Sequence, residues 1–307
     1  MKRPSFLLIL ILTLIAACKA PVEKSADALP LIITSIYPYE LLVKQMVGDA
    51  IEVRSLIPAN ASVHSFSPQP SDLKDLHKAD LILINGMGLE AMFEPQLNQL
   101  KDKLLISEDL LSDLIALDSL NQVRDVLMHS HEEEEEHHHP GADPHLWTSI
   151  PMMTKLATKL RSELVTRFPD AAPVINHNFA EIVEELAQAH DKITSERSAY
   201  PKPALVTYHN SFHYFTRDYD ILYLGWVQSS PGKEPGARDL ANLGAKIRSH
   251  NVRRIFIEPQ QNPKSAEVLA KEYRLELGTL DPIGASLNVS TITELILKNW
   301  EAMKLAF

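Results

Sequence analysis

Short apolar runs rich in β-branched residues recur along this chain, and segments with helical periodicity separate them. The runs form two groups of four, at 31–36, 53–57, 81–86 and 103–107, and at 204–208, 221–227, 253–258 and 277–281. Strands that alternate with helices form parallel sheets covered by helices. The alternation therefore predicts an α/β fold of two lobes, each built on a parallel β-sheet flanked by helices.

A long helix is predicted between the two groups of strands. Residues 174–199 keep helical periodicity without a proline or glycine, and at ~1.5 Å per residue they reach roughly 40 Å. We expect an N-terminal lobe at 30–170, a rigid linking helix at 171–199 and a C-terminal lobe at 200–307. Shorter helices are expected at 39–47, 71–78, 90–99, 151–168, 210–218, 236–250 and 264–274. Ligands of such sheets bind beyond the carboxyl ends of the strands, so the cleft between the lobes is the expected site.

The first residues have the layout of a secretory signal peptide. A basic start is followed by an apolar run that ends at Ile15, too short to span a membrane as a mature helix, and then by two alanines and Cys18. The sequence Ile-Ala-Ala-Cys resembles a bacterial lipobox; the alternative is that Cys18 is an ordinary residue of a discarded leader. We expect a signal peptide at 1–17, a lipid-modified Cys18 and a flexible tether at 18–29, which would hold the protein on the extracytoplasmic side of a membrane.

Cysteine usage and charge narrow the chemistry further. Cys18 is the only cysteine among 307 residues, so a metal site must draw on His, Asp, Glu or solvent. The formal net charge is −10, and the run Glu132–Glu136 supplies half of it. Basic residues are not clustered, so nucleic acid is not an expected partner.

Four potential metal ligands come from separate segments next to predicted strands or helices. They are His64, His145, His209 and Asp281. Three imidazoles and one carboxylate suit a tetrahedral divalent ion such as zinc. Each residue also has an ordinary alternative as a turn or helix-cap residue, and Asp281 precedes a proline, as in many turns. The motif HExxH is absent, so zincin-type hydrolysis has no support, and a metallohydrolase that uses the same cluster is the less favoured alternative.

Five motifs carry a family resemblance. In chain order they are the turn ending in His64 with the following SPQPSDLKDLHKADLILING, then DPHLW, YHNSFHYF, IEPQ and LDPIG. Together they resemble the solute-binding lipoproteins of bacterial zinc and manganese ABC importers, over essentially the whole mature chain. The resemblance implies that His64, His145, His209 and Asp281 bind the ion and that a rigid helix bridges two α/β lobes. It also implies a monomer without enzymatic activity that captures Zn²⁺ and delivers it to an ABC permease in the membrane.

The third ligand position bears on the choice of metal. Manganese-type relatives carry Glu where this chain has His209, and imidazole favours Zn²⁺ over the harder Mn²⁺. Two positions depart from the family pattern, since Val63 stands where some zinc-type members have Glu, and His213 stands where a small residue is common. We therefore expect zinc as the transported ion and Mn²⁺ as the less favoured one. Lipid-anchored relatives have been described as adhesins, which makes cell adhesion a further alternative.

A histidine- and glutamate-rich stretch at 129–141 precedes DPHLW. Residues 129–139 lack apolar side chains, so we expect a solvated loop that serves solubility or collects zinc weakly. Its possible accessory ligands are His129, His131, His137, His138 and His139. Asp143 and Glu258, at the edges of their motifs, are candidates to orient the imidazoles from outside. We expect the remaining helical histidines on solvated surfaces; they are His77, His177, His190 and His250.

Overall fold

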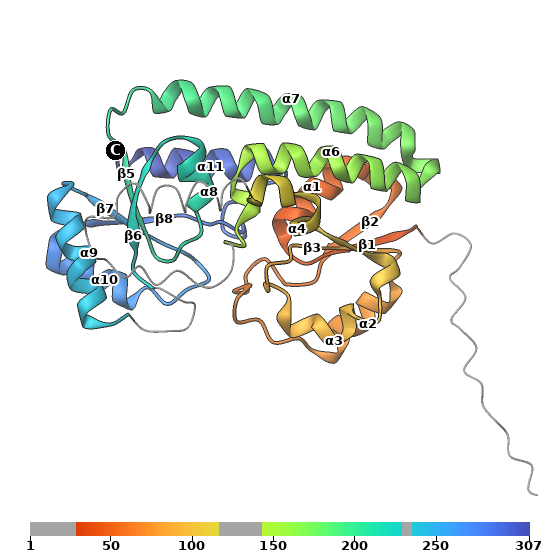
Figure 1. The fold of residues 1–307 in the computed structure, drawn as a ribbon, viewed down its shortest axis with the longest axis horizontal. Helices are drawn as coiled ribbons and strands as arrows, with labels where there is room; N and C mark the ends of the chain where they lie inside the picture. Colours follow the sequence, from red (N-terminus) through yellow and green to blue (C-terminus); the bar gives the residue numbers. More distant parts are fainter. Residues whose placement is uncertain (1–28, 117–142, 229–234) are drawn as a thin grey trace, which may run out of the picture.

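The computed structural model describes residues 29–116, 143–228 and 235–307, and its main feature is a pair of parallel four-stranded sheets, one in each lobe (Figure 1). The N-terminal lobe consists of β1 (Leu31–Thr34), α1 (Tyr37–Val47), β2 (Glu52–Ser55), α2 (Pro70–Lys78), β3 (Leu81–Ile84), α3 (Glu94–Leu97), β4 (Leu104–Ile106) and α4 (Ser107–Leu110). Its strand order is β2-β1-β3-β4, and every neighbouring pair is parallel. The inner strands β1 and β3 read LIIT and LILI and are buried at every residue, as expected where helices cover both faces of a sheet.

The C-terminal lobe repeats this arrangement. It consists of β5 (Ala204–Thr207), α8 (His213–Asp218), β6 (Leu222–Trp226), α9 (Ala237–Ser249), β7 (Arg254–Ile257), α10 (Lys264–Tyr273) and β8 (Glu276–Thr279). Its strand order is β6-β5-β7-β8, again parallel throughout. In each sheet the order reverses beside the first strand, between β1 and β3 or between β5 and β7. This switch point is where such sheets bind ligands beyond the carboxyl ends of their strands.

Helix α6 (Ile150–Arg167) follows the segment that carries DPHLW. The Ser149 side chain caps the helix by accepting a hydrogen bond from the Met152 N–H. The predicted apolar stripe is buried throughout; it consists of Met153, Leu156, Leu160 and Leu164. The cap and the stripe together fix where the chain enters the helix, and the candidate residues of DPHLW lie directly before that point.

Helix α7 (Ala172–Arg197) crosses from one lobe to the other, as Figure 1 shows, and α6 runs beneath it. Near its start, the Asn178 amide donates to the carbonyl oxygens of Gln45 and Met46 at the end of α1. At its end, the Arg197 guanidinium donates to the Tyr219 carbonyl at 2.8 Å. The helix is therefore fastened to both lobes, in agreement with the predicted linking helix.

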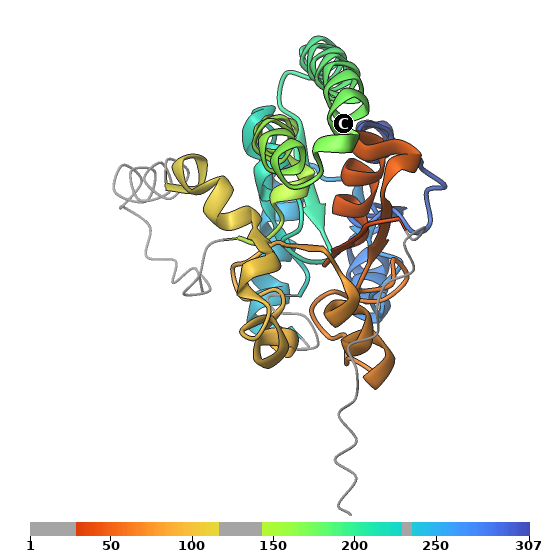
Figure 2. The ribbon, with the colours of Figure 1, turned by 90° about the vertical axis from the view of Figure 1, so that its right-hand side faces the viewer.

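A continuous apolar core runs through both lobes. Buried side chains of β1, β3, α6 and α7 form one cluster with C-terminal residues that include Phe215, Leu280 and Trp300. Helix α11 (Ile292–Lys304) completes this cluster and packs against α1 and α7; Figure 2 shows it from the end of the molecule. A smaller second cluster, around Leu243 and Ile255, lies between the C-terminal sheet and helices α9 and α10. The shared core joins the lobes by buried contacts as well as by chain connections.

One predicted helix is wrong in the N-terminal lobe. Residues 90–99 form a 3₁₀ turn (Ala91–Phe93) followed by the short helix α3 in place of one continuous helix. Pro95 accounts for the break, because a proline has no N–H to donate to the carbonyl four residues earlier, so it stands in the first turn of the new helix α3.

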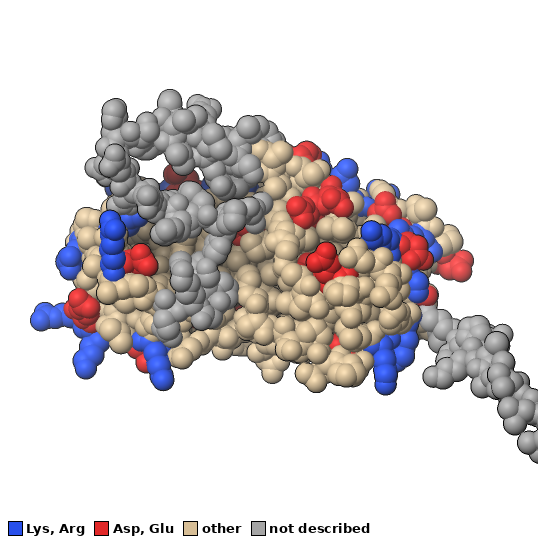
Figure 3. All heavy atoms as spheres, turned by 60° about the horizontal axis from the view of Figure 1, so that its bottom comes forward, with Lys and Arg blue, Asp and Glu red and all other residues tan. Residues whose placement is uncertain are grey.

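The surface is mixed in charge on the face that Figure 3 shows, where Lys and Arg side chains alternate with Asp and Glu. Within the described ranges, no helix has both the length and the apolar character needed to cross a membrane.

Candidate metal centre

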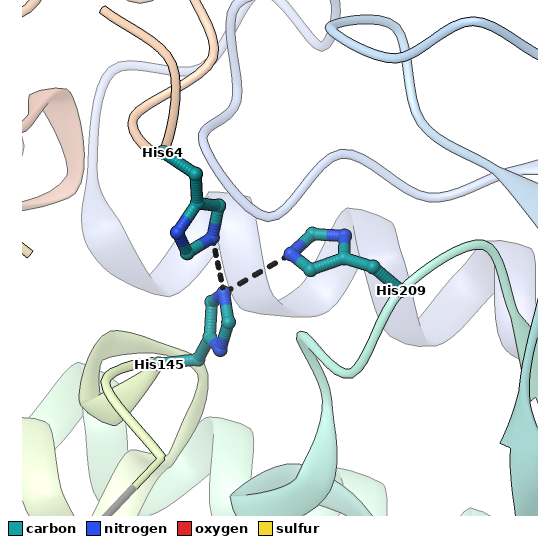
Figure 4. Close-up of side chains that lie close together, drawn as sticks. All are labelled: His64, His145 and His209. Carbon is teal, nitrogen blue, oxygen red and sulfur yellow. Dashed lines mark hydrogen bonds between the residues drawn. The ribbon is translucent and has the colours of Figure 1, made fainter. Parts of the chain in front are cut away.

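Three histidines from distant segments meet at one point between the lobes. His64 lies in the loop after β2, His145 precedes the 3₁₀ turn Leu146–Thr148 that leads into α6, and His209 is the second residue after β5. The His145 Nε2 atom lies 3.2 Å from Nε2 of His64 and 3.1 Å from Nε2 of His209 (Figure 4). Ligand nitrogens at ~2.0–2.1 Å from a tetrahedral zinc ion stand roughly 3.3 Å apart. The three rings thus already have the spacing of a metal site.

Asp143 sets the orientation of His145. One Asp143 carboxylate oxygen accepts the His145 backbone N–H at 2.9 Å and pairs with the ring Nδ1 at 2.7 Å. Burial raises the pKa of Asp143, but the charge and hydrogen bonds of His145, with a smaller contribution from His213, hold it below its ordinary value. An ionised Asp143 accepts the proton of Nδ1, which leaves the lone pair of Nε2 for an ion.

Glu258 does the same for His209. The two residues follow the neighbouring strands β7 and β5, at the switch point of the C-terminal sheet, and Glu258 Oε1 lies 2.6 Å from His209 Nδ1. Burial lowers the pKa of His209, but the charge and hydrogen bond of Glu258, together with Asp143, raise it above its ordinary value. The His209 carbonyl also accepts hydrogen bonds from Thr207 at 2.7 Å and Tyr223 at 3.1 Å. Backbone and ring are both held in place.

His64 stands on a loop and is half-buried, whereas the other two histidines are buried. Two backbone turns shape this loop, from Ala61 N–H to the Pro58 carbonyl and from Ser65 N–H to the Ser62 carbonyl. The centroid of the His64 ring lies 5.3 Å from the ring centroids of both His145 and His209. Its loop is further fixed by Phe66, which stacks on Phe93 of the lobe with centroids 6.0 Å apart.

Asp281 is not brought into this group. The three histidines form the one set of at least three possible ligands, among the described residues, whose ligand atoms all lie within 4.8 Å of one another. Asp281 follows β8 and is fully buried, and its carboxylate accepts five hydrogen bonds from neighbouring groups. The family resemblance implies Asp281 as the fourth ligand, but in this structure its carboxylate is hydrogen-bonded to Gln260 and to the loop that follows it.

The sequence as a whole matches one protein family. Residues 32–306 match the family described as ZnuA, "Zinc-uptake complex component A periplasmic". The chain belongs to this family. It is 30% identical over 268 residues to the high-affinity zinc uptake system protein ZnuA of Haemophilus ducreyi, which covers 84% of this chain and 86% of that protein.

Two further likenesses agree with the family. The chain is 28% identical over 285 residues to the zinc-binding lipoprotein AdcA of Streptococcus pneumoniae serotype 4, which covers 92% of this chain and 56% of that protein. A crystal structure of ZnuA has a TM-score of 0.73 to this chain at 22% identity, and the match covers 91% of this chain and 99% of that one. The structural likeness supports the two-lobed fold.

The other described histidines do not belong to this group of three. His77, His177 and His250 are exposed, as predicted. The prediction of a solvated surface is wrong for His190, because its ring packs on Tyr219 and its Nδ1 lies 3.1 Å from the Tyr219 hydroxyl. His213 contacts the ring of Tyr214. Cys18 and the accessory histidines at 129–139 lie outside the described residues.

Sequence reasoning missed several residues around the histidines. Trp147 packs on the His145 ring and donates from Nε1 to the Pro282 carbonyl at 2.8 Å. Ser62 and Gln260 line the same pocket as the three histidines. Trp147 and Gln260 lie inside the motifs DPHLW and IEPQ, so the sequence pointed to the segments that contain them. Their roles could not be predicted, because their contacts depend on how the two lobes pack against each other.

Proposed function

We propose that this protein captures Zn²⁺ outside the cytoplasm and delivers it to the membrane permease of an ABC importer. The observation that carries the proposal is the convergence of three Nε2 atoms between the lobes, with neighbours 3.1–3.2 Å apart. Membership of the periplasmic zinc-uptake family supports it. His64, His145 and His209 are the proposed ligands, and no catalytic role is proposed.

The orientation of the imidazoles suits the site to bind an ion. His145 and His209 are each paired through Nδ1 with a buried carboxylate, so their rings keep one tautomer and one direction. Such outer partners make imidazole more basic and raise metal affinity. The carboxylates of Asp143 and Glu258 also lie where negative charge offsets the double charge of the ion, which a mostly buried site requires.

Zinc is the proposed ion in preference to manganese. All three converging groups are imidazoles, which suit Zn²⁺, whereas Mn²⁺ favours carboxylate, carbonyl and water oxygens. A glutamate at position 209 would have moved the donor set toward manganese. Competition between the two ions for the metal-free protein tests this order directly.

Attachment to the membrane through Cys18 is part of the same proposal. A lipid-anchored, monomeric binding protein would stay close to its permease, and one of the related proteins is named as a lipoprotein. The anchor is tested by labelling cells with a radioactive fatty acid: incorporation that disappears in Cys18→Ala supports it, and incorporation that persists contradicts it.

Calorimetric zinc titration of single variants tests the ligands. We expect His64→Ala, His145→Ala and His209→Ala each to weaken zinc binding by more than about 100-fold, since each removes a direct ligand, where loss of a mere outer partner costs about 10–100-fold. His177→Ala is the matched control, because His177 is exposed on α7 and far along the chain from the site. Tight binding that survives all three substitutions would refute the assignment.

Deletion of residues 129–139 tests the accessory role of the histidine- and glutamate-rich stretch. We expect the deleted protein to keep its tight zinc site and to lose only weak, exchangeable zinc equivalents. Such a stretch has many potential ligands and little preorganisation. Loss of the tight site on deletion would show that these histidines are direct ligands.

A further inference from the structure

The outer end of the C-terminal lobe carries a group of basic side chains that play no part in the candidate metal centre. Helices α9 and α10 lie on the side of this lobe that is remote from the N-terminal lobe (Figure 1). Both helices end where strands β7 and β8 begin, at the amino edge of the sheet, whereas His209 and Glu258 follow the strands at its carboxyl edge. A partner bound at the amino edge therefore leaves the metal centre open.

The chain from α9 through β7 is basic. Residues 240–257 contain four Lys or Arg residues and no Asp or Glu, and the end of α10 adds two more cations. The six residues are Lys246, Arg248, Arg253, Arg254, Lys271 and Arg274. All of them except Lys246 and Arg254 are exposed.

Contacts between helix ends and strand starts place these side chains on one surface. The Arg248 guanidinium lies over the Tyr273 ring, 5.1 Å from its centroid, and Tyr273 directly precedes Arg274. The Glu276 N–H donates to the Arg253 carbonyl at 2.8 Å, so the starts of β7 and β8 are neighbours. Figure 3 shows Lys and Arg side chains projecting from this end of the molecule. The sequence led us to expect no cluster of basic residues, but segments that are apart in the chain meet at this edge. We call the six cations the amino-edge surface.

Acidic groups beside the amino-edge surface are fewer. Glu276 forms an ion pair with Arg254, and Glu272 is exposed near the end of α10. Farther along the edge, at the start of β6, Asp220 pairs with Arg197 of α7. The six cations thus exceed the two neighbouring carboxylates by four charges, in a chain whose formal net charge is −10.

Helix dipoles do not account for this surface by themselves. Basic residues in the last turn of a helix offset its dipole, but Arg253 lies outside the helices. Helix ends also meet strand starts at the amino edge of the N-terminal sheet, and charges there are mixed. They are Asp49, Glu52, Asp80 and Asp102 beside Lys78, Lys101 and Lys103. The excess of positive charge is therefore particular to the C-terminal lobe.

We propose that the amino-edge surface binds the anionic headgroups of a phospholipid membrane. The chain belongs to a periplasmic family, so membranes bound its compartment, and several exposed cations spread over one edge suit an extended anionic surface. Val268 on α10 and Leu277 on β8 are 60% and 38% exposed and add apolar contact with the headgroup region. The contact holds the C-terminal lobe at the membrane. It depends on an extracytoplasmic location and is independent of the zinc site.

Sedimentation with vesicles tests the proposal. The chain from residue 18 onward with Cys18→Ala carries no attached lipid and keeps every residue that the structure describes. At about 0.1 M salt, we expect it to bind vesicles of equal parts phosphatidylglycerol and phosphatidylcholine more tightly than vesicles of phosphatidylcholine alone. Combining Arg253→Gln with Arg274→Gln should weaken binding to the anionic vesicles by about 25-fold, because each Lys or Arg near such a surface contributes roughly fivefold.

Lys74→Gln combined with Lys101→Gln is the matched control. Both lysines are exposed in the N-terminal lobe, and the net charge changes by the same amount, so vesicle binding should not change. Zinc affinity should be unaltered in both double variants, because neither touches the metal centre.

Two outcomes would overturn the proposal. Equal losses of vesicle binding in the two double variants would show that net charge alone matters. Equal binding of the Cys18→Ala chain to the two kinds of vesicle, unaffected by added salt, would exclude a membrane contact and leave an acidic protein as the partner. This second measurement needs no further substitution, so it holds even where a double variant fails to fold. Absence of tight zinc binding is a separate result, which refutes the proposed function alone.

Discussion

The buried pair of His209 and Glu258 shows how a single contact prepares the site. The carboxylate lies 2.6 Å from Nδ1 of the imidazole and also accepts a hydrogen bond from the Ser211 hydroxyl at 3.0 Å. With its proton held on Nδ1, His209 turns Nε2 toward the other two histidines. The same contact raises the pKa of the ring, so Glu258 favours both a bound ion and a bound proton.

Glu258→Gln should weaken zinc binding. The amide keeps the shape of the side chain but loses the negative charge, and loss of an outer partner costs about 10–100-fold in metal affinity. Competition with a chromophoric chelator at neutral pH measures the change. Glu276→Gln, at an exposed position on β8, is the control and should bind zinc as the unsubstituted chain does. Equal affinities for the two variants would contradict the role of Glu258.

Zinc affinity should also depend on pH, because a proton and the ion compete for His209. Burial lowers the pKa of this ring, but Glu258 and Asp143 raise it above its ordinary value of 6.5. The affinity should therefore begin to fall at a pH above 6.5 as the solution is acidified. In Glu258→Gln the decline should move to lower pH, because the main raising contribution is gone. Chelator competition between about pH 5 and 8 measures both curves, and coincident declines would refute the coupling.

The histidines could be found from sequence, and the state of Asp281 could not. Each histidine lies next to a predicted strand or helix, and residues at the carboxyl ends of parallel strands converge. Asp281 obeys the same rule by position. Its carboxylate nevertheless accepts hydrogen bonds from Ser286 and Gln260. These hydrogen bonds depend on the conformation of a loop, which the hydrophobic periodicity of a sequence does not predict.

At the scale of the elements, the strands were more predictable than the helices that pack on them. All eight strands lie within about two residues of the predicted runs. The inner strands β1 and β3 were the plainest, because buried parallel strands are short continuous apolar segments. Helix α11 was not predicted, although Thr291 caps it and its buried residues recur with helical spacing. Its role depends on the tertiary contacts with α1 and α7, which single-sequence reasoning does not supply.

Glu196 ties the linking helix α7 to α11. Its carboxylate accepts hydrogen bonds from Trp300 Nε1 and Lys304 Nζ, both at 2.7 Å, and it also pairs with Lys192. These contacts, that with Lys192 first, lower its pKa to about 2. A lowered pKa means that the carboxylate stabilises the fold while it is ionised. The contribution is present above the ordinary value of 4.5 and is lost as the pH falls toward about 2.

Glu196→Gln should therefore lower the free energy of unfolding at neutral pH, by about 1 kcal/mol because the group is partly exposed to solvent. Urea unfolding at several pH values measures this. The difference from the unsubstituted chain should shrink as the pH falls from 4.5 toward about 2. Glu184→Gln is the control, since this exposed residue on the same helix bonds only to nearby Gln188 among the contacts described. A deficit that persists unchanged in acid would contradict the electrostatic origin.

At the scale of the whole molecule, the segment 143–149 joins the lobes at the candidate metal centre. Its side chains and backbone make contacts with the C-terminal lobe through Tyr214, Asp218 and Pro282. The apolar core is continuous across the lobes, and α7 is fastened to both. Wide separation of the lobes would break all of these contacts, so we expect ion release to rely on movements of the loops around the site.

Trp147 makes the central contact between the segment 143–149 and the C-terminal lobe. Its Nε1 donates to the Pro282 carbonyl at 2.8 Å, and its ring contacts those of His145 and Tyr39. Trp147→Phe keeps an aromatic ring but leaves the buried carbonyl without its donor, at a cost of about 1–3 kcal/mol. We expect a lower melting temperature and weaker zinc binding together, because the same contact stabilises the fold and holds His145 beside the pocket. Thermal unfolding with and without zinc, followed by calorimetric titration, measures both effects.

Tyr37→Phe is the matched control for Trp147→Phe. The Tyr37 hydroxyl donates to the Val289 carbonyl at 3.3 Å in a partly buried contact that lies outside the pocket lining. Its loss should cost at most the ordinary net value of about 0.5–1.5 kcal/mol and leave zinc affinity unchanged. If Trp147→Phe bound zinc as tightly as Tyr37→Phe, the contact between Trp147 and Pro282 would stabilise the fold without affecting the zinc site. Release of the ion would then have to begin elsewhere, at the half-buried proposed ligand His64.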